Sequence, residues 1–255
     1  MRYQTIQVRF EGSVCFLKLY RPEFKNTIND LLIEECTEVL QTCKKEMTVV
    51  VLEGLPDVFC FGSDFKLIQD RMHNQTIKVQ QPDKLYDLFI LLSNGPYISV
   101  AYVKGKVNAG GVGFVAACDI VLADETATFG LSELLFGLFP ACVLPFLIRK
   151  TGYQHAHYMT LMNKAISVQQ AEKFGLVDMY EGNGDKLLKR HLIHLKRLSK
   201  NSITEYKNYM NTLANLALER TKILAVNANK SMFENRDNLS KISAFMENGT
   251  VPWQS

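Results

Sequence analysis

The stretch YISVAYVKGKVNAGGVGFVAACDIVLADETATF, residues 97–129, indicates the fold class of this chain. It begins with an apolar, partly β-branched run over 97–103, which predicts a strand covered on both faces. Residues 110–118 are rich in small side chains, which suit a helix packed closely against a sheet. Short strands are expected over 120–123 and 127–129. Strands that alternate with helices in this way are typical of an α/β layer fold.

The same alternation extends toward the N-terminus. Two strands are expected over residues 5–10 and 14–20, joined as a hairpin by a glycine-containing turn. The apolar residues of 28–43 then recur at helical spacing. Either Asn26 or Thr27 is expected to cap that helix, because both residue types accept hydrogen bonds from the first turn.

The rest of the chain becomes increasingly helical. A further buried strand is predicted over 47–52, and a helix over 85–93. Between them the polar segment 69–84 is the best candidate for a mobile loop or lid. After residue 140 helices dominate, and the last two are expected at about 204–227 and 238–247.

Composition excludes several classes of protein. The chain has 255 residues, a net charge of +3 and no sustained basic run, so nucleic-acid binding is not expected. No apolar run reaches the roughly 18 residues that a membrane helix needs, and the first residues lack a signal-peptide core, so a cytoplasmic protein is expected. The six cysteines are scattered, which favours buried free thiols. Neither the cysteines nor the histidines form a metal-binding pattern, so no metal is expected.

Three segments carry the residues suited to chemistry. They are VFCFGSDF at 58–65, KGKVNAGGVG at 104–113 and FGLSELLFGLFP at 129–140. Each follows or includes the end of a predicted strand. Glycines at such positions let the backbone approach a ligand closely, and Glu133 is a carboxylate among apolar neighbours, where its pKa is expected to rise.

These segments resemble the crotonase (enoyl-CoA hydratase/isomerase) superfamily, in the same order and at suitable spacing. The matching residues are Arg21-Pro22 to Asn26, Phe59 to Asp64, Ala109-Gly110-Gly111 followed by Cys118-Asp119, and Ser132-Glu133 to Pro140. The likeness is greatest to the branch of hydratase homologues that serve polyketide β-methyl branching, over residues 106–111, 132–149 and 157–162.

The resemblance implies a fold and an assembly. It implies an α/β protein with a crotonase-type ββα spiral core over residues 1–195. A helical C-terminal region over 196–255 is then expected to pack on the core and on a neighbouring subunit. A homotrimer or a hexamer is the implied assembly.

The resemblance also implies an activity. Members of this branch dehydrate a 3-hydroxy-3-methylglutaryl thioester on an acyl carrier protein to the 3-methylglutaconyl thioester. No separate cofactor is implied, because the phosphopantetheine or CoA thioester is part of the substrate. Three alternatives stay open: an ordinary enoyl-CoA hydratase or isomerase, a 3-methylglutaconyl decarboxylase of the same fold, and a catalytically silent scaffold.

By matching position, the backbone amides of Ser63 and Gly110 would form the oxyanion hole, and Glu133 would be the acid/base. The alternative for Gly110 and its neighbour Gly111, which is expected to contact substrate, is close packing of a helix on a strand. The alternative for Glu133 is a surface residue at a helix start. Family hydratases carry a second glutamate where this chain has Gly113, which cannot transfer a proton.

The remaining candidates would bind substrate or carrier. Asp64 is expected to organise its loop more than to react, and Phe61 and Phe65 line the acyl or pantetheine tunnel or belong to the core. The candidates for the distal carboxylate of the substrate are Lys66, Arg71, Lys84 and Tyr86. The candidates for an acidic carrier protein are Arg21, Lys25, Lys104 and Lys106.

Overall fold

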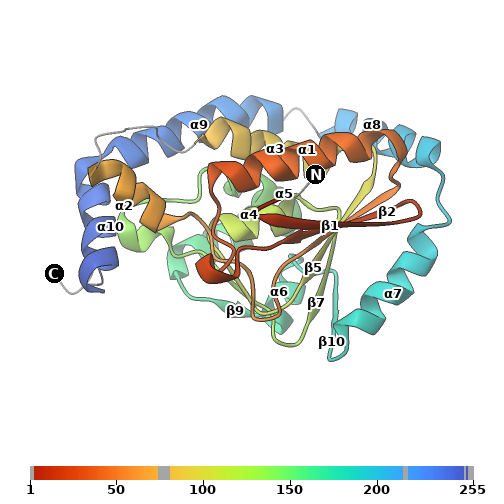
Figure 1. The fold of residues 1–255 in the computed structure, drawn as a ribbon, viewed down its shortest axis with the longest axis horizontal. Helices are drawn as coiled ribbons and strands as arrows, with labels where there is room; N and C mark the ends of the chain where they lie inside the picture. Colours follow the sequence, from red (N-terminus) through yellow and green to blue (C-terminus); the bar gives the residue numbers. More distant parts are fainter. Residues whose placement is uncertain (1–2, 74–80, 215–217, 250, 252–255) are drawn as a thin grey trace.

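The chain folds around two sheets, which Figure 1 shows in ribbon form. The computed structural model describes residues 3–73, 81–214, 218–249 and 251. Among these, the larger sheet has the strand order β1-β2-β3-β5-β7-β10, and β1 and β2 form an antiparallel hairpin while the other neighbours run parallel. Its strands are β1 (Ile6–Glu11), β2 (Val14–Leu19), β3 (Val49–Glu53), β5 (Ile98–Val103), β7 (Ile120–Asp124) and β10 (Met179–Glu181). The predicted N-terminal hairpin is therefore confirmed.

The smaller sheet places the site. Its order is β4-β6-β8-β9, in which β4, β6 and β8 run parallel. The strands are β4 (Val58–Cys60), β6 (Lys106–Asn108), β8 (Thr128–Gly130) and β9 (Ile166–Ser167). The chain alternates between the sheets, from β3 to β4, from β5 to β6 and from β7 to β8. This is the predicted ββα spiral, and it brings the carboxyl ends of β4, β6 and β8 to one edge.

Strand β3 shows why the central strands read as continuous apolar runs. Val50 and Leu52 belong to the main hydrophobic core, whereas Val49 and Val51 belong to a second cluster on the opposite face. That second face is covered by α7 (Gly184–Leu195), which lies apart from the other long helices in Figure 1. Both faces are thus buried, so alternation with polar residues is lost.

Helices fill the connections and the C-terminal region. They are α1 (Asp30–Glu46), α2 (Phe65–His73), α3 (Pro82–Asn94), α4 (Gly110–Ala117), α5 (Leu144–Met162), α6 (Val168–Lys173), α8 (Lys200–Ala214), α9 (Leu218–Glu234) and α10 (Arg236–Asn248), with 3-10 helices η1 (Pro22–Phe24) and η2 (Glu133–Phe136). The predicted cap of α1 was wrong: the Asn29 side chain accepts from the Leu32 N–H. Asn26 is instead buried, and its amide donates to the carbonyls of Leu19 and Phe59, each at 3.0 Å.

One further expectation needs correction. The segment 69–84 is helical at both ends, in α2 and α3, and its residues 74–80 lie outside the described part of the chain. The helix expected at about 204–227 falls in α8, up to residue 214, and in α9, from residue 218, and its residues 215–217 also lie outside the described part. The helix expected at about 238–247 corresponds to α10.

The C-terminal helices belong to the same packed body as the strands. Leu218, Ala225 and Val226 of α9 are buried in the main core cluster, and Met232 and Ile242 pack with the η2 segment. Other apolar side chains on α5, α8 and α9 stay exposed, including Tyr153, Leu161, Leu213, Ile223 and Leu224. Within the described residues, no helix is both long and apolar enough to cross a membrane.

Candidate functional site

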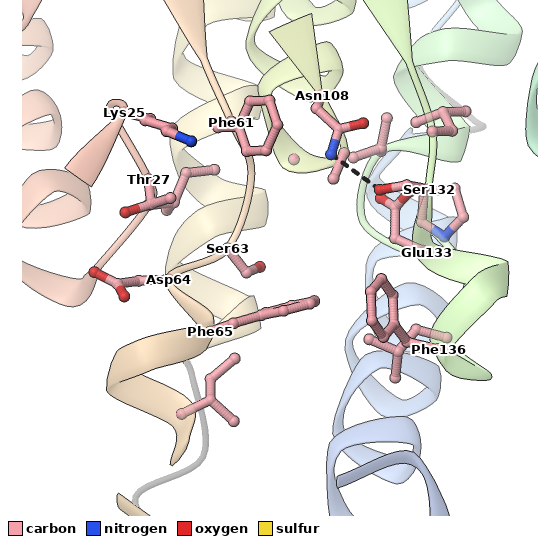
Figure 2. A pocket seen from close by; sticks show the side chains of 18 of the residues that line it. Lys25, Thr27, Phe61, Ser63, Asp64, Phe65, Asn108, Ser132, Glu133 and Phe136 are labelled. Atoms are coloured by element: carbon pink, nitrogen blue, oxygen red, sulfur yellow. Dashed lines mark hydrogen bonds between the residues drawn. The ribbon is translucent and has the colours of Figure 1, made fainter. Parts of the chain in front are cut away.

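A cavity of about 750 Å³ lies where the three predicted segments meet. Figure 2 shows Phe61, Ser63 and Phe65 on one wall and Ser132 and Glu133 on the facing wall. Each segment follows one parallel strand of the small sheet, so their convergence is a consequence of the strand order. Ligands bind outside the carboxyl ends of parallel strands for the same reason in other α/β proteins.

The first two segments touch through their backbones. Gly62 has φ +90°, and a Cβ there would lie 2.7 Å from the Ala109 Cβ and 3.4 Å from the Gly110 nitrogen. Ser63 is tied to this loop because its neighbours Gly62 and Asp64 exchange backbone hydrogen bonds with Ile28. Within the described residues, the N–H groups of Ser63 and Gly110 donate to no other group of the chain. Both are therefore free to meet a ligand oxygen.

Ala109 turns the chain sharply between β6 and α4. Its φ of +51° and ψ of −123° are rare for a residue with a Cβ, and such a backbone costs about 1–3 kcal/mol. The turn is held by the Ala109 N–H, which donates to the Gly130 carbonyl at 2.9 Å. Gly110 follows at the first position of α4, where the helix dipole favours negative charge.

Gly111 is absent from the lining of this cavity, so the structure does not support its predicted contact with substrate. A Cβ on Gly111 would lie 2.4 Å from the Cys60 carbonyl oxygen. This glycine lets α4 pack closely on β4, which was the alternative interpretation. Gly110 differs, because it lines the cavity and its Cβ position meets the Ile28 side chain at 2.8 Å.

Glu133 begins the short helix η2 and lines the cavity. Its Oε2 is inaccessible to water and has no hydrogen-bond partner within the described part of the chain. Burial raises the pKa of this carboxyl to about 7, against the smaller effect of the backbone amides of Glu133 and Ser132. A carboxyl with a pKa near neutrality can both accept and return a proton. The Ser132 hydroxyl receives a hydrogen bond from Asn108 at 2.9 Å, which holds this segment against β6.

Asp64 lines the cavity but its carboxylate is already engaged. Oδ2 pairs with Arg21 at 3.0 Å, and Oδ1 accepts from the Leu67 N–H in the first turn of α2. Both side chains of the pair are buried. This geometry favours the loop-organising interpretation of Asp64. It also removes Arg21 from the candidates for a carrier-protein contact, because its guanidinium faces Asp64 and the Thr27 carbonyl.

The position of the missing second glutamate is filled. Gly113 is buried within α4, and a Cβ there would lie 2.5 Å from Cζ of Phe89. Val143 closes the same space at 3.1 Å from that Cβ position. Aromatic and aliphatic side chains therefore occupy the space into which a longer residue would extend. In this structure Gly113 belongs to the packed core beneath the cavity.

Aromatic rings form the apolar lining. Phe65 packs edge-on against Phe136 at 5.2 Å, and Phe136 packs against Phe245 of α10 at 5.3 Å. Phe61 is 38% exposed at the rim, with the Lys25 ammonium 5.5 Å from its ring centre. Phe61 and Phe65 both line the cavity, so neither is plain core.

The structure separates the four candidates for the distal carboxylate. Tyr86 is fully buried and donates to the Leu218 carbonyl at 2.8 Å, and Lys84 pairs with Glu34 at the surface, so neither faces the cavity. Lys66 lines the cavity, whereas the side chain of Arg71 lies outside the described residues.

The candidates for a contact with the carrier protein also differ in their surroundings. Lys25 and Lys106 line the cavity and are exposed, whereas Lys104 pairs with Asp185.

Sequence reasoning missed four asparagines that line the cavity, of which Asn29 caps α1. Asn108, Asn163 and Asn229 come from β6, the end of α5 and α9. Asn108 directly precedes the Ala109-Gly110 turn, so its place after a strand is a usable signal. Asn229 has no local signal, because a polar residue on an amphipathic helix is ordinary. All six cysteines are buried, as predicted, and no metal-binding group of three or more side chains occurs among the residues described.

Comparison with known proteins gives concordant results. The sequence matches the enoyl-CoA hydratase/isomerase family over residues 9–255. It is 53% identical to the bacillaene synthase dehydratase PksH of Bacillus subtilis (strain 168) over 99% of this chain and 97% of that protein. A crystal structure of a B. subtilis protein described as a polyketide biosynthesis enoyl-CoA hydratase superposes with a TM-score of 0.96, at 53% identity, over 98% of this chain and all of that one.

A more distant structure shows that the fold persists. The enoyl-CoA hydratase of Bacillus halodurans superposes with a TM-score of 0.86 at 18% identity, over 94% of this chain and 100% of that one. The sequence match, the close relative and the spiral of two sheets agree with one another. This chain belongs to the enoyl-CoA hydratase/isomerase family.

Proposed function

We propose that this chain is a hydro-lyase that dehydrates a 3-hydroxyacyl thioester. The proposed substrate is 3-hydroxy-3-methylglutaryl-acyl carrier protein, and the proposed product is 3-methylglutaconyl-acyl carrier protein, in polyketide β-methyl branching. The name of the 53% identical relative, a dehydratase of bacillaene synthase, supports this choice. The observation that carries the proposal is Glu133, a carboxyl with a pKa of about 7 in the same cavity as Ser63 and Gly110. Within the described residues, neither its Oε2 nor the two backbone amides have a hydrogen-bond partner.

The backbone amides would stabilise the enolate. Removing a proton from C2 places negative charge on the thioester oxygen, which the N–H groups of Ser63 and Gly110 would receive. A fixed donor of this kind is typically worth about 3–4 kcal/mol in the transition state. The two amides are held in place because the loop at Gly62 packs directly against the turn at Ala109 and Gly110. A Cβ on Gly62 would lie 2.7 Å from the Ala109 Cβ and 3.4 Å from the Gly110 nitrogen.

A single carboxyl can carry out both proton transfers of the dehydration. The Glu133 carboxylate takes the proton from C2, and the electrons of that C–H bond form the enolate. As the enolate collapses, a C2–C3 double bond forms and the C3–O bond breaks. The departing hydroxide takes the proton back from Glu133 and leaves as water. No second carboxyl is needed, which agrees with the filled position at Gly113.

The positive charges at the rim of the cavity suit an acidic carrier protein. Lys25 and Lys106 are exposed and line the cavity, on segments that flank the two amide-bearing loops. Cations placed this way attract an acidic carrier protein and orient it over the opening. The pantetheine arm would then enter past Phe61 with its thioester at the amides of Ser63 and Gly110.

The decisive experiment is intact-mass spectrometry of a carrier protein loaded with 3-hydroxy-3-methylglutarate. The expected result is loss of one water that disappears in Glu133→Gln. Further loss of carbon dioxide would identify a decarboxylase instead. Turnover of the CoA thioester alone would point to ordinary CoA metabolism, and no change with either handle would favour a silent scaffold.

The assembly and cellular location are also proposals. We propose that the chain forms a homotrimer or a hexamer in the cytoplasm. The exposed apolar side chains of α8 and α9, including Leu213, Ile223 and Leu224, are the surface that such an assembly would cover. Sedimentation analysis of the wild type and of Leu224→Glu tests this, since a monomeric wild type would contradict it.

A further inference from the structure

The wall of the cavity formed by the C-terminal helices carries a polar group that the proposed chemistry leaves unused. Asn229 of α9 lines the cavity together with Phe233 of the same helix and Phe245 of α10. Its Oδ1 is inaccessible to water and has no hydrogen-bond partner within the described part of the chain. An amide left unpaired among apolar side chains destabilises the free protein, so a ligand that pairs with it gains affinity.

A second asparagine of the cavity, Asn163, is differently placed. Its buried Oδ1 also has no partner among the described residues, but its amide nitrogen donates to the carbonyls of Thr160 and Leu161, at 3.3 and 3.2 Å. Those contacts cap the end of α5 and orient Asn163 toward its own helix. No such contact within the described residues holds Asn229, whose carboxamide is free to turn either end toward a ligand.

The position of Asn229 defines which part of a substrate it meets. Lys25, Phe61 and Lys106 lie at the exposed rim, and the reacting groups Ser63 and Glu133 lie further in. The C-terminal helices lie on the far side, joined to the Glu133 segment through Phe136 and Phe245. In Figure 2 these helices, coloured blue, run beside Phe136, away from Lys25. A thioester that enters at the rim therefore points its acyl terminus toward α9.

We infer that Asn229 is a specificity-determining residue whose carboxamide hydrogen-bonds the terminal carboxyl of the acyl chain. This inference rests on the proposed function, since it assumes an acyl group with its thioester at Ser63 and Gly110. The neighbouring Phe233 and Phe245 rings offer no hydrogen bond, so the Asn229 carboxamide favours acyl chains that carry a hydrogen-bonding terminus there. Neither Tyr86 nor Lys84 competes for this role, because each is bonded away from the cavity. Lys66 also lines the cavity, but it is exposed, unlike the Oδ1 of Asn229.

The test measures binding without turnover, in a Glu133→Gln background. Calorimetry compares 3-hydroxy-3-methylglutaryl-CoA with 3-hydroxy-3-methylbutyryl-CoA, which lacks the terminal carboxyl. Adding Asn229→Leu is expected to weaken binding of the first by about tenfold or more and to leave the second within about twofold. Asn227→Leu is the matched control, because Asn227 is exposed on the same helix and does not line the cavity.

Asn229→Asp provides a second variant of nearly the same shape. Its negative charge repels a carboxylate but not a methyl group, so the preference for the carboxylated thioester should fall further. Equal loss for both thioesters, no loss for either, or the same loss in Asn227→Leu would overturn the inference. Because binding is read without chemistry, failure of the wild type to dehydrate 3-hydroxy-3-methylglutaryl-acyl carrier protein would contradict the proposed function and not this assignment.

Discussion

Two carboxylates of this chain, Asp119 and Glu133, stand in opposite surroundings. Asp119 follows α4, and its Oδ2 accepts from the Ser99 N–H at 2.8 Å and pairs with the buried ammonium of Lys207 at 2.6 Å. Lys207 also donates to the Tyr97 carbonyl at 2.9 Å. Glu133 has an Oε2 without any partner among the described residues, although the residue lines a cavity of about 750 Å³.

The difference separates stability from function. Asp119 joins the end of α4 to β5 and α8, and each buried polar atom around it has a partner. Removing one member of such a group leaves a buried charge uncompensated. Glu133 is costly to the fold in its ionised form, because burial disfavours the charged carboxylate and so raises its pKa. A fold retains such a group where a reaction needs it.

The largest expected effect is on catalysis. Glu133→Gln keeps the shape of the side chain but removes its acid and base function, so kcat/KM should fall by about 10³-fold. In the wild type, activity should rise with pH through about 7 as Glu133 loses its proton. Initial rates from pH 5 to 9 measure both. Near-wild-type turnover by Glu133→Gln would contradict a catalytic role for Glu133.

The contribution of Asp119 to stability is tested by removing its carboxylate. Asp119→Ala leaves the Lys207 ammonium buried with the Tyr97 carbonyl as its partner, so the free energy of unfolding should fall by about 3 kcal/mol. Urea denaturation measures this. The control is Glu34→Ala, which breaks the exposed pair with Lys84 and should cost less than about 1 kcal/mol. Equal losses in the two variants would contradict the contrast.

The pH dependence of stability sharpens the comparison. Glu133 has a folded pKa of about 7, above its ordinary value of 4.5, so the folded state binds the proton more tightly than the unfolded state. Its contribution to stability is fully present below pH 4.5 and is lost as the pH rises through 7. Glu133→Gln abolishes that loss, so above pH 7 it should exceed the wild type by at most about 3 kcal/mol. If the free energies of unfolding of the wild type and of Glu133→Gln changed with pH in the same way between pH 4.5 and above 7, the burial of Glu133 would be contradicted.

The smallest effect concerns the position where a second carboxyl would stand. Gly113→Ala places a Cβ 2.5 Å from the Phe89 ring, and the gain in helix propensity offsets part of the clash. A net loss of about 1 kcal/mol is expected in thermal unfolding, with dehydratase activity retained. Phe89→Leu in the same chain should recover stability. An activity loss at full stability would place Gly113 in the site after all.

Much of the site was predictable because its signals are local. Glu133, Ser63, Gly110, Phe61 and Phe65 each lie in a short segment after a strand, and all of them line the cavity. Gly111 was not separable from Gly110 by sequence, because the difference lies in which neighbour each would touch: the Cys60 carbonyl for one, Ile28 and the cavity for the other. The cap of α1 failed for a similar reason, since long-range carbonyls already engage Asn26.

By itself, the sequence determined the longer strands of the large sheet and the helices beside them, because burial on both faces leaves continuous apolar runs and amphipathic helices leave periodic ones. The short strands β4, β6, β9 and β10 were not predicted from it. The sequence also identified the three segments that carry the candidate chemistry. Only the tertiary structure decided that β4, β6 and β8 run parallel side by side, so that these segments share one cavity. It also decided that Phe89 fills the space at Gly113 and that α9 brings Asn229 to the cavity. Such contacts join residues far apart in the chain, and local patterns do not record them.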